Sequence, residues 1–235
     1  MTLGNCADLA VAVWGMVDRA DLGQTVRAIV AGAREHTTAA EVGVFRRRSG
    51  AEVEVAGTST ELVRRADELQ LQLGQGPCRA AALTNDTYRV DHLDADRRWP
   101  RWTAAAAGLG WRSILSIPLA TGGGCLGALN LYSDRPWSFS SDDAAAAQVF
   151  AQHASLALGL RLSEERLREE MRDQHLLGLA QGILMERYQV TTSQAAQLIE
   201  DHARQGEVTP RALAERIIAA RQGPWERAAA RVLSS

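Results

Sequence analysis

Proline is absent from residues 137–209, and this gap constrains the fold more than any other feature of the sequence. At its start, Ser140 and Asp143 form a capping signal that favours the beginning of a helix. With no proline to interrupt it, one helix can run from there to the vicinity of Arg187, which is roughly 70 Å at 1.5 Å per residue. The sequence therefore predicts an unusually long connecting helix.

Leucines recur along one side of this predicted helix. The seam consists of Leu156, Leu160, Leu167 and Leu177, and it is diluted by Ser163 and Gln174. A repeat of this kind is typical of two parallel helices that pair between subunits. The alternative is a long helix that packs on its own domain. We expect a homodimer that forms through the long helix.

The composition is that of an ordinary globular protein. Of the 235 residues, 46% are hydrophobic and 23% are charged, which is enough chain for one large or two small domains. The net charge of −2 excludes a generic basic coat for nucleic acids, so any nucleic-acid contact must be local. All 26 basic residues are arginine, so each phosphate contact would come from a planar guanidinium group.

Several classes of site and segment are not expected. Cys6, Cys78 and Cys125 are too scattered for a disulfide framework or a zinc site, and we expect no metal. The amino terminus has no basic leader, and the alanine-rich run over residues 144–160 is too short and too polar to span a membrane. A cytoplasmic protein with no membrane partner is expected.

The first part of the chain has a mixed α+β pattern. Residues 5–37 are predicted to be helical, with a capping signal at Asp21 and Gln24 that opens a second segment, and a further helix is predicted over residues 61–71. Short strands are predicted at residues 42–45 and 53–56, joined as a hairpin, and at residues 88–93. The segment LGQGPC at residues 73–78 is predicted to be a loop.

The clearest strand signal lies at residues 113–132. Ser113, Leu115, Ile117 and Leu119 alternate with Ile114, Ser116 and Pro118, as expected for a strand with two distinct faces. Three glycines at residues 122–124 turn the chain, and residues 125–132 return antiparallel. An antiparallel sheet with flanking helices is predicted.

Two shorter helices are predicted after Arg187. The first opens with a capping box at Thr191 and Gln194, and Gly206 ends it. The second opens at Thr209, with Pro210 at the first helical position. Together with the end of the long helix, these form a predicted three-helix bundle.

The run LGLAQGILMERY at residues 177–188 resembles the first-helix signature of the ANTAR domain. Alanines at the expected downstream spacings extend the resemblance, and residues 161–223 would form this domain, with residues 224–235 as a tail. The signature and core positions are Ala180, Gly182, Met185, Ala195, Ala203 and Ala214. The resemblance implies an RNA-binding antiterminator whose dimers hold paired stem-loops with six-nucleotide loops, with no DNA partner.

Arginines and one tyrosine are the candidate RNA contacts in this region. They are Arg187, Tyr188, Arg204, Arg211 and Arg216, and each has an alternative as an ordinary surface or capping residue. The sequence departs from the family pattern at Gln174, Gln181, Ala196, Glu207 and Thr209. Over residues 161–235, 11 arginines face 11 acidic residues, so nonspecific electrostatic affinity for RNA is expected to be weak.

The segments GQGPC, DRRWPRW, GWRSILSIPL and LGALNLYSDRPWSFS resemble a GAF domain, which would occupy residues 1–160 with its core from about residue 20. GAF folds bind various small molecules, so an unidentified ligand is implied, with no cofactor specified. Candidate pocket residues are Cys78, Trp99, Trp102 and Trp111, although tryptophans more often belong to the core.

Two other functions remain open for this first part of the chain. Cys78 follows a glycine-proline turn, where a nearby helix amino terminus can lower a thiol pKa and allow redox sensing. Some GAF domains reduce free methionine sulfoxide through cysteines, and such an enzyme is the less favoured alternative. A sensor that acts through protein-protein contacts is the other. No catalytic residue is assigned.

Overall fold

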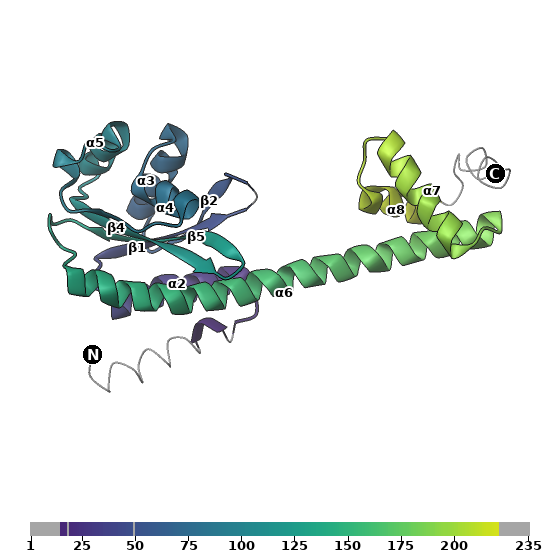
Figure 1. Ribbon diagram of the computed structural model, residues 1–235, viewed down its shortest axis with the longest axis horizontal. Coiled ribbons are helices and arrows are strands. Elements are labelled where there is room, and N and C mark those ends of the chain that lie inside the picture. The colour runs from purple at the N-terminus through teal and green to yellow at the C-terminus, as the bar shows by residue number, and fades with distance from the viewer. Residues whose placement is uncertain (1–14, 18, 49, 221–235) are drawn as a thin grey trace. The chain divides into compact units, whose positions relative to one another are not determined.

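The computed structural model describes residues 15–17, 19–48 and 50–220 (Figure 1). These residues fall into two compact units, the first reaching Ser163 and the second beginning at Glu164. The helix expected over residues 5–14, Cys6 and the tail at residues 224–235 lie outside the described residues. None of the described helices combines the length and apolar character needed to span a bilayer.

The first unit is built on a five-stranded antiparallel sheet, as predicted. Its order is β2-β1-β5-β4-β3, and the strands are β1 (Glu41–Arg47), β2 (Val53–Thr58), β3 (Tyr88–Val90), β4 (Ser113–Thr121) and β5 (Gly124–Ser133). The glycine turn joins β4 to β5 as expected. Strand β3 is shorter than predicted, because residues 93–95 form a turn of 3-10 helix.

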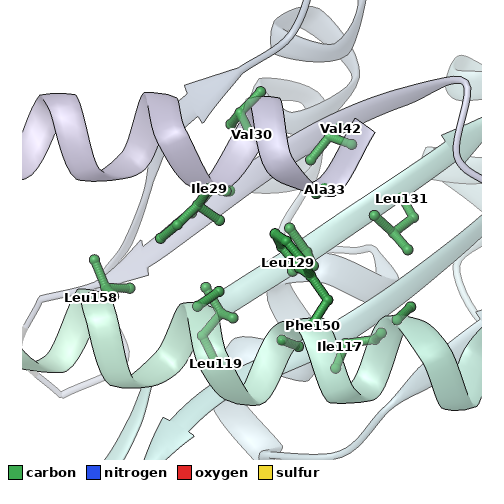
Figure 2. Packing of buried hydrophobic residues seen from close by; sticks show 14 of the residues in the cluster. Ile29, Val30, Ala33, Val42, Ile117, Leu119, Leu129, Leu131, Phe150 and Leu158 are labelled. Carbon is green, nitrogen blue, oxygen red and sulfur yellow. The ribbon is translucent and has the colours of Figure 1, made fainter. Parts of the chain in front are cut away.

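Two helices cover one face of this sheet (Figures 1 and 2). They are α2 (Leu22–His36) and the first part of α6 (Ser141–Tyr188). Ile29 of α2, Leu119 of β4 and Phe150 of α6 belong to one buried cluster, in agreement with the predicted alternation of β4. The side chain of Asp21 caps α2 by accepting from Gln24 N at 2.7 Å. Residues 15–17 are helical and residues 19–21 are not, so the cap at Asp21 opens a second helical segment as predicted.

Three shorter helices cover the opposite face: α3 (Glu61–Leu73), α4 (Pro77–Thr84) and α5 (Pro100–Gly108). The second and third were not predicted from the sequence. Each is only two or three turns long and rich in alanine, so neither produces a strong apolar period. Of the predicted LGQGPC loop, only residues 74–76 lie outside helices, because Leu73 ends α3 and Pro77 is the first residue of α4.

The second unit is the predicted helical bundle. The last part of α6 packs with α7 (Thr192–Gln205) and α8 (Pro210–Ala219), and α6 is one continuous helix of 48 residues as expected. The capping box at Thr191 and Gln194 is present, and Thr209 caps α8. The bundle core contains Ala180, Leu184, Ala195, Leu198, Ile199, Ala203, Leu213, Ala214 and Ile217.

Two residues of α6 lie differently from expectation. Gly182 was expected at a close helix contact, but it is exposed and a Cβ built on it would meet no atom within 4 Å. Gly182 lies on the opposite face of α6 from Ala180, which is buried against the other helices of the bundle. Leu177 was expected in the subunit seam, whereas it packs partly buried against the core of its own bundle.

This contrast along α6 gives a paired test of the bundle. We expect Ala180→Leu, and Ala195→Leu on α7, to overpack the core and lower the free energy of unfolding by about 1–3 kcal/mol. The matched change Gly182→Ala should raise it by about 0.5–1 kcal/mol, because glycine is unfavourable inside a helix and its Cβ would have space. Urea unfolding followed by circular dichroism measures the free energy of unfolding of each variant. Alanine-to-leucine variants as stable as wild type would contradict this packing.

Candidate functional site

A cluster of buried polar side chains lies in the first unit, between the sheet and helices α3 and α4. All of its members are fully buried: Asp67, Gln70, Cys78, Ser116, Asn130 and Tyr132. Buried polar groups cost free energy unless they are hydrogen-bonded, so such a cluster inside an apolar layer requires a specific arrangement. We call it the polar cluster.

Gln70 of α3 holds the beginning of α4. Its Oε1 accepts from Cys78 N at 2.9 Å, and its Nε2 donates to Cys78 Sγ at 2.6 Å and to Tyr132 OH at 3.2 Å. Ser116 Oγ donates to Cys78 Sγ at 3.3 Å. A Cβ on Gly76 would lie 2.1 Å from Gln70 Oε1, and the φ of +140° at this residue also requires glycine. The GQGPC motif is therefore explained by this contact.

Asp67 is the acid of the polar cluster. Its Oδ1 accepts from Tyr132 OH at 2.6 Å and from Asn130 Nδ2 at 3.3 Å. Oδ2 has no hydrogen-bond partner among the described residues. Burial raises the pKa of Asp67 to about 7, against the opposing effect of these hydrogen bonds and of the Arg64 charge.

The environment of Cys78 contradicts the lowered thiol pKa that its sequence context suggested. Complete burial, and then the charge of Asp67, raise the pKa of Cys78 well above its ordinary value. Burial likewise raises the pKa of Cys125, which is partly buried. Because the thiolate is the reactive form, this environment opposes redox sensing and sulfoxide reduction through Cys78.

The three candidate tryptophans belong to the core or its rim. Trp102 is fully buried and donates from Nε1 to Ala66 O at 3.0 Å. Trp111 is 4% exposed, and its ring centroid lies 5.0 Å from that of Tyr132. Trp99 is only partly buried, with the Arg98 guanidinium 4.7 Å from its ring centroid. These positions fit the core interpretation better than an open pocket.

Two candidate RNA contacts of the second unit are engaged with acids. Arg211 of α8 lies 2.7 Å from Asp173 of α6 and 3.1 Å from Glu215. The hydrogen bond to Glu215, followed by the charge of Asp173, raises its pKa. Arg204 lies 3.2 Å from Asp201. These pairs, which the sequence did not predict, reduce the positive charge that the bundle offers to a phosphate.

The other candidates differ in accessibility. Tyr188 packs partly buried on the bundle core, with its hydroxyl buried and unpartnered among the described residues, so its ring is not an open stacking surface. Arg187 is exposed beside a surface hollow lined by Gly178, Leu179, Gly182, Ile183 and Glu186. Arg216 is exposed and has no ion pair with another described residue.

Two of the departures from the family pattern acquire a structural meaning. Glu207 has a φ of +51°, in the left-handed region where asparagine is much better tolerated than glutamate. Thr209 Oγ1 accepts from Ala212 N at 3.2 Å and so caps α8. Asparagine would therefore suit this backbone turn better than the glutamate present.

Comparison with known families agrees with this architecture. Residues 21–158 match the GAF domain family, which is more than half of the 235 residues. The chain belongs to the GAF domain family. Residues 165–218 match the ANTAR domain, so a GAF domain is followed by an ANTAR domain in one chain. No curated protein matches the sequence.

Solved structures share the fold of the GAF domain at low sequence identity. The GAF domain of a phosphoenolpyruvate-protein phosphotransferase from Coxiella burnetii is 16% identical with a TM-score of 0.54, over 69% of this chain and 96% of that one. Free methionine-R-sulfoxide reductase from Neisseria meningitidis is 17% identical with a TM-score of 0.52, over 70% and 95%. Identities this low show the fold alone.

The turn before α8 provides a test of the backbone explanation. We expect Glu207→Asn to raise the free energy of unfolding of the ANTAR domain by about 1 kcal/mol or less, because asparagine fits the left-handed conformation. Thr209→Lys should lower it by about 0.5–2 kcal/mol through loss of the cap. Urea titrations measure both, and a destabilised Glu207→Asn would disprove the backbone explanation.

Proposed function

We propose that this protein is a signal-responsive transcription antiterminator, in which the GAF domain controls RNA binding by the ANTAR domain. The observation that carries the proposal is the ANTAR match at residues 165–218 directly after a GAF domain. The RNA target would be a pair of stem-loops with six-nucleotide loops in a nascent transcript, in the cytoplasm. DNA is not an expected partner.

The charge of the ANTAR domain predicts how it would bind. The bundle region carries equal numbers of arginines and acids, and Arg204 and Arg211 are paired with acids. Phosphate neutralisation then contributes little, so recognition would depend on the shape and exposed bases of RNA loops. Arg187 and Arg216 are also exposed on the surface, as are the two paired arginines.

Exposed apolar residues on α6 support a dimer. Leu156 is 64% exposed and Leu160 is 49% exposed in the first compact unit, and Leu167 is 53% and Met171 is 72% exposed in the second. Large apolar side chains that recur at such spacings on a helix favour pairing with a second helix. We propose that α6 pairs in parallel with that of a second copy.

The GAF domain would act as the regulatory part rather than as an enzyme. Both domains are of regulatory families, and the raised pKa values of Cys78 and Cys125 oppose thiol catalysis. A small molecule is proposed as the signal, and its identity is left open. In the alternative, a sensor that signals through protein contacts, the GAF domain would also be the regulatory part.

The proposed dimer has a direct test. We expect light scattering to give the mass of a dimer at micromolar concentration. The double variant Leu160→Glu with Leu167→Glu should give a monomer, because the charges would be buried at the pairing surface. The control Leu62→Glu changes a leucine of α3 that is 44% exposed, and it should stay dimeric. A wild-type monomer would contradict the pairing.

RNA binding is the decisive test of function. We expect paired stem-loops to bind at least about tenfold more tightly than one stem-loop, because two ANTAR domains of a dimer engage both loops. The salt dependence should be shallow, corresponding to roughly two to four phosphates. Arg187→Ala and Arg216→Ala should each weaken binding in a fluorescence titration.

The matched control is Arg65→Ala, which removes an exposed arginine from α3 of the GAF domain and should leave RNA affinity unchanged. Equal affinity for paired stem-loops and scrambled RNA, across the ligands tried, would exclude antitermination and favour a protein-contact role for the bundle.

A further inference from the structure

Two buried oxygens of the polar cluster stand without partners. Asp67 Oδ2 and Asn130 Oδ1 have no hydrogen bond among the described residues, although both side chains are fully buried. A buried polar atom left unpaired costs about 1–3 kcal/mol, so two in one cluster require an explanation. As long as Asp67 is a carboxylate, both atoms are acceptors and neither can satisfy the other.

A single proton changes this balance. The two planar groups are already joined, because Asn130 Nδ2 donates to Asp67 Oδ1 at 3.3 Å. A carboxylic acid can donate as well as accept, and an amide offers one acceptor beside its donor. A proton on Asp67 Oδ2 removes the buried charge and makes this oxygen a possible donor to an acceptor such as Asn130 Oδ1.

The space around the carboxyl group favours a proton over a larger ligand. A Cβ built on Gly43 of β1 would lie 2.2 Å from Asp67 Oδ2, so this oxygen lies directly against the strand backbone. The other oxygen is surrounded by donors from Tyr132, Asn130 and Gln70. On the Gly43 side, another molecule would have no room at Oδ2.

We propose that Asp67 and Asn130 form a proton-binding site in the GAF core, occupied below neutral pH, and that loss of this proton loosens the cover of α3 and α4 over the sheet. Ionisation of Asp67 places a negative charge beside Gln70, and Gln70 is the residue whose hydrogen bonds to Cys78 hold the start of α4 against α3. The GAF domain is then sensitive to pH through its core, independently of RNA binding.

The neighbours of Asp67 leave its negative charge poorly compensated. The neighbouring cation is Arg64 of its own helix, which is exposed and lies 3.3 Å from Glu61. Strand β5 contributes Asn130 and Tyr132, α4 contributes Cys78, and β1 contributes only the backbone of Gly43. The pKa values of Cys78 and Tyr132 are themselves raised by burial, so both stay neutral.

The direction of the pH effect follows from the pKa of Asp67, which rises from 3.8 to about 7 on folding. Between these values the folded chain holds a proton that the unfolded chain has lost, so stability falls as pH rises. For this group alone the unfolding equilibrium constant increases about tenfold per pH unit across that window and then levels off. Below the window Asp67 contributes no pH dependence.

The test compares wild type with Asp67→Asn, whose amide replaces the protonated acid with a permanently neutral group. Urea unfolding of the GAF domain is followed by tryptophan fluorescence from pH 4 to pH 8. We expect the ratio of wild-type to variant unfolding constants to rise about tenfold per pH unit up to about pH 7. Glu68→Gln removes an exposed acid one residue away, and its unfolding constant should change with pH in the same way as that of wild type. A constant ratio for Asp67→Asn would overturn the proposal.

A second measurement needs no destabilising change. The carboxyl carbon of Asp67, followed by NMR in the full-length wild-type protein, should titrate with a midpoint near 7. Tyr132→Phe removes the 2.6 Å hydrogen bond that favours the ionised form and should move the midpoint upward. A wild-type midpoint at or below the ordinary value of 3.8 would disprove the site. Because neither measurement involves RNA, failure here is distinct from failure of the antiterminator proposal.

Discussion

The unbroken backbone hydrogen bonding of α6 is the constraint on which the rest of the structure depends. Phe150 and Leu158 of this helix pack in the GAF core, and Ala180 and Leu184 pack in the ANTAR core. Neither hydrophobic core is complete without its part of α6. Because a continuous helix resists a break in its middle, a change in how α6 packs in one core can alter the helix that enters the other. In the proposed function, α6 is the segment through which a signal from the GAF domain would reach the ANTAR domain.

The GAF core combines two kinds of layer. Under α2 and α6 the buried layer is mainly apolar, and such packing tolerates volume-conserving changes of side chains. Under α3 and α4, hydrogen bonds of the polar cluster fix the position of each member, because a displaced donor leaves a buried acceptor unpaired. The polar layer therefore specifies the arrangement of its helices more sharply, and it is the layer that responds to a change in protonation.

Local signals allowed much of this architecture to be predicted from the sequence. The caps at Asp21 and Thr191 and the glycine turn after β4 depend on neighbouring residues, so short motifs reveal them. Pairing of β1 with β5 and the polar cluster depend on residues far apart in sequence, such as Asp67 and Tyr132, and no local period indicates them. For the same reason the sequence marked Arg211 as a candidate contact but not its partner Asp173.

The ion pairs of the ANTAR domain bear on how selective the proposed RNA binding can be. A phosphate that approaches Arg211 has to replace Asp173 and Glu215, so the net gain is small for any RNA that offers charge alone. An RNA that also presents bases in the correct geometry gains contacts that do not depend on displacing an acid. Neutral charge thus lowers affinity for unrelated RNA more than for a shaped target. Joining two such domains through α6 would then restore affinity by avidity while keeping that discrimination.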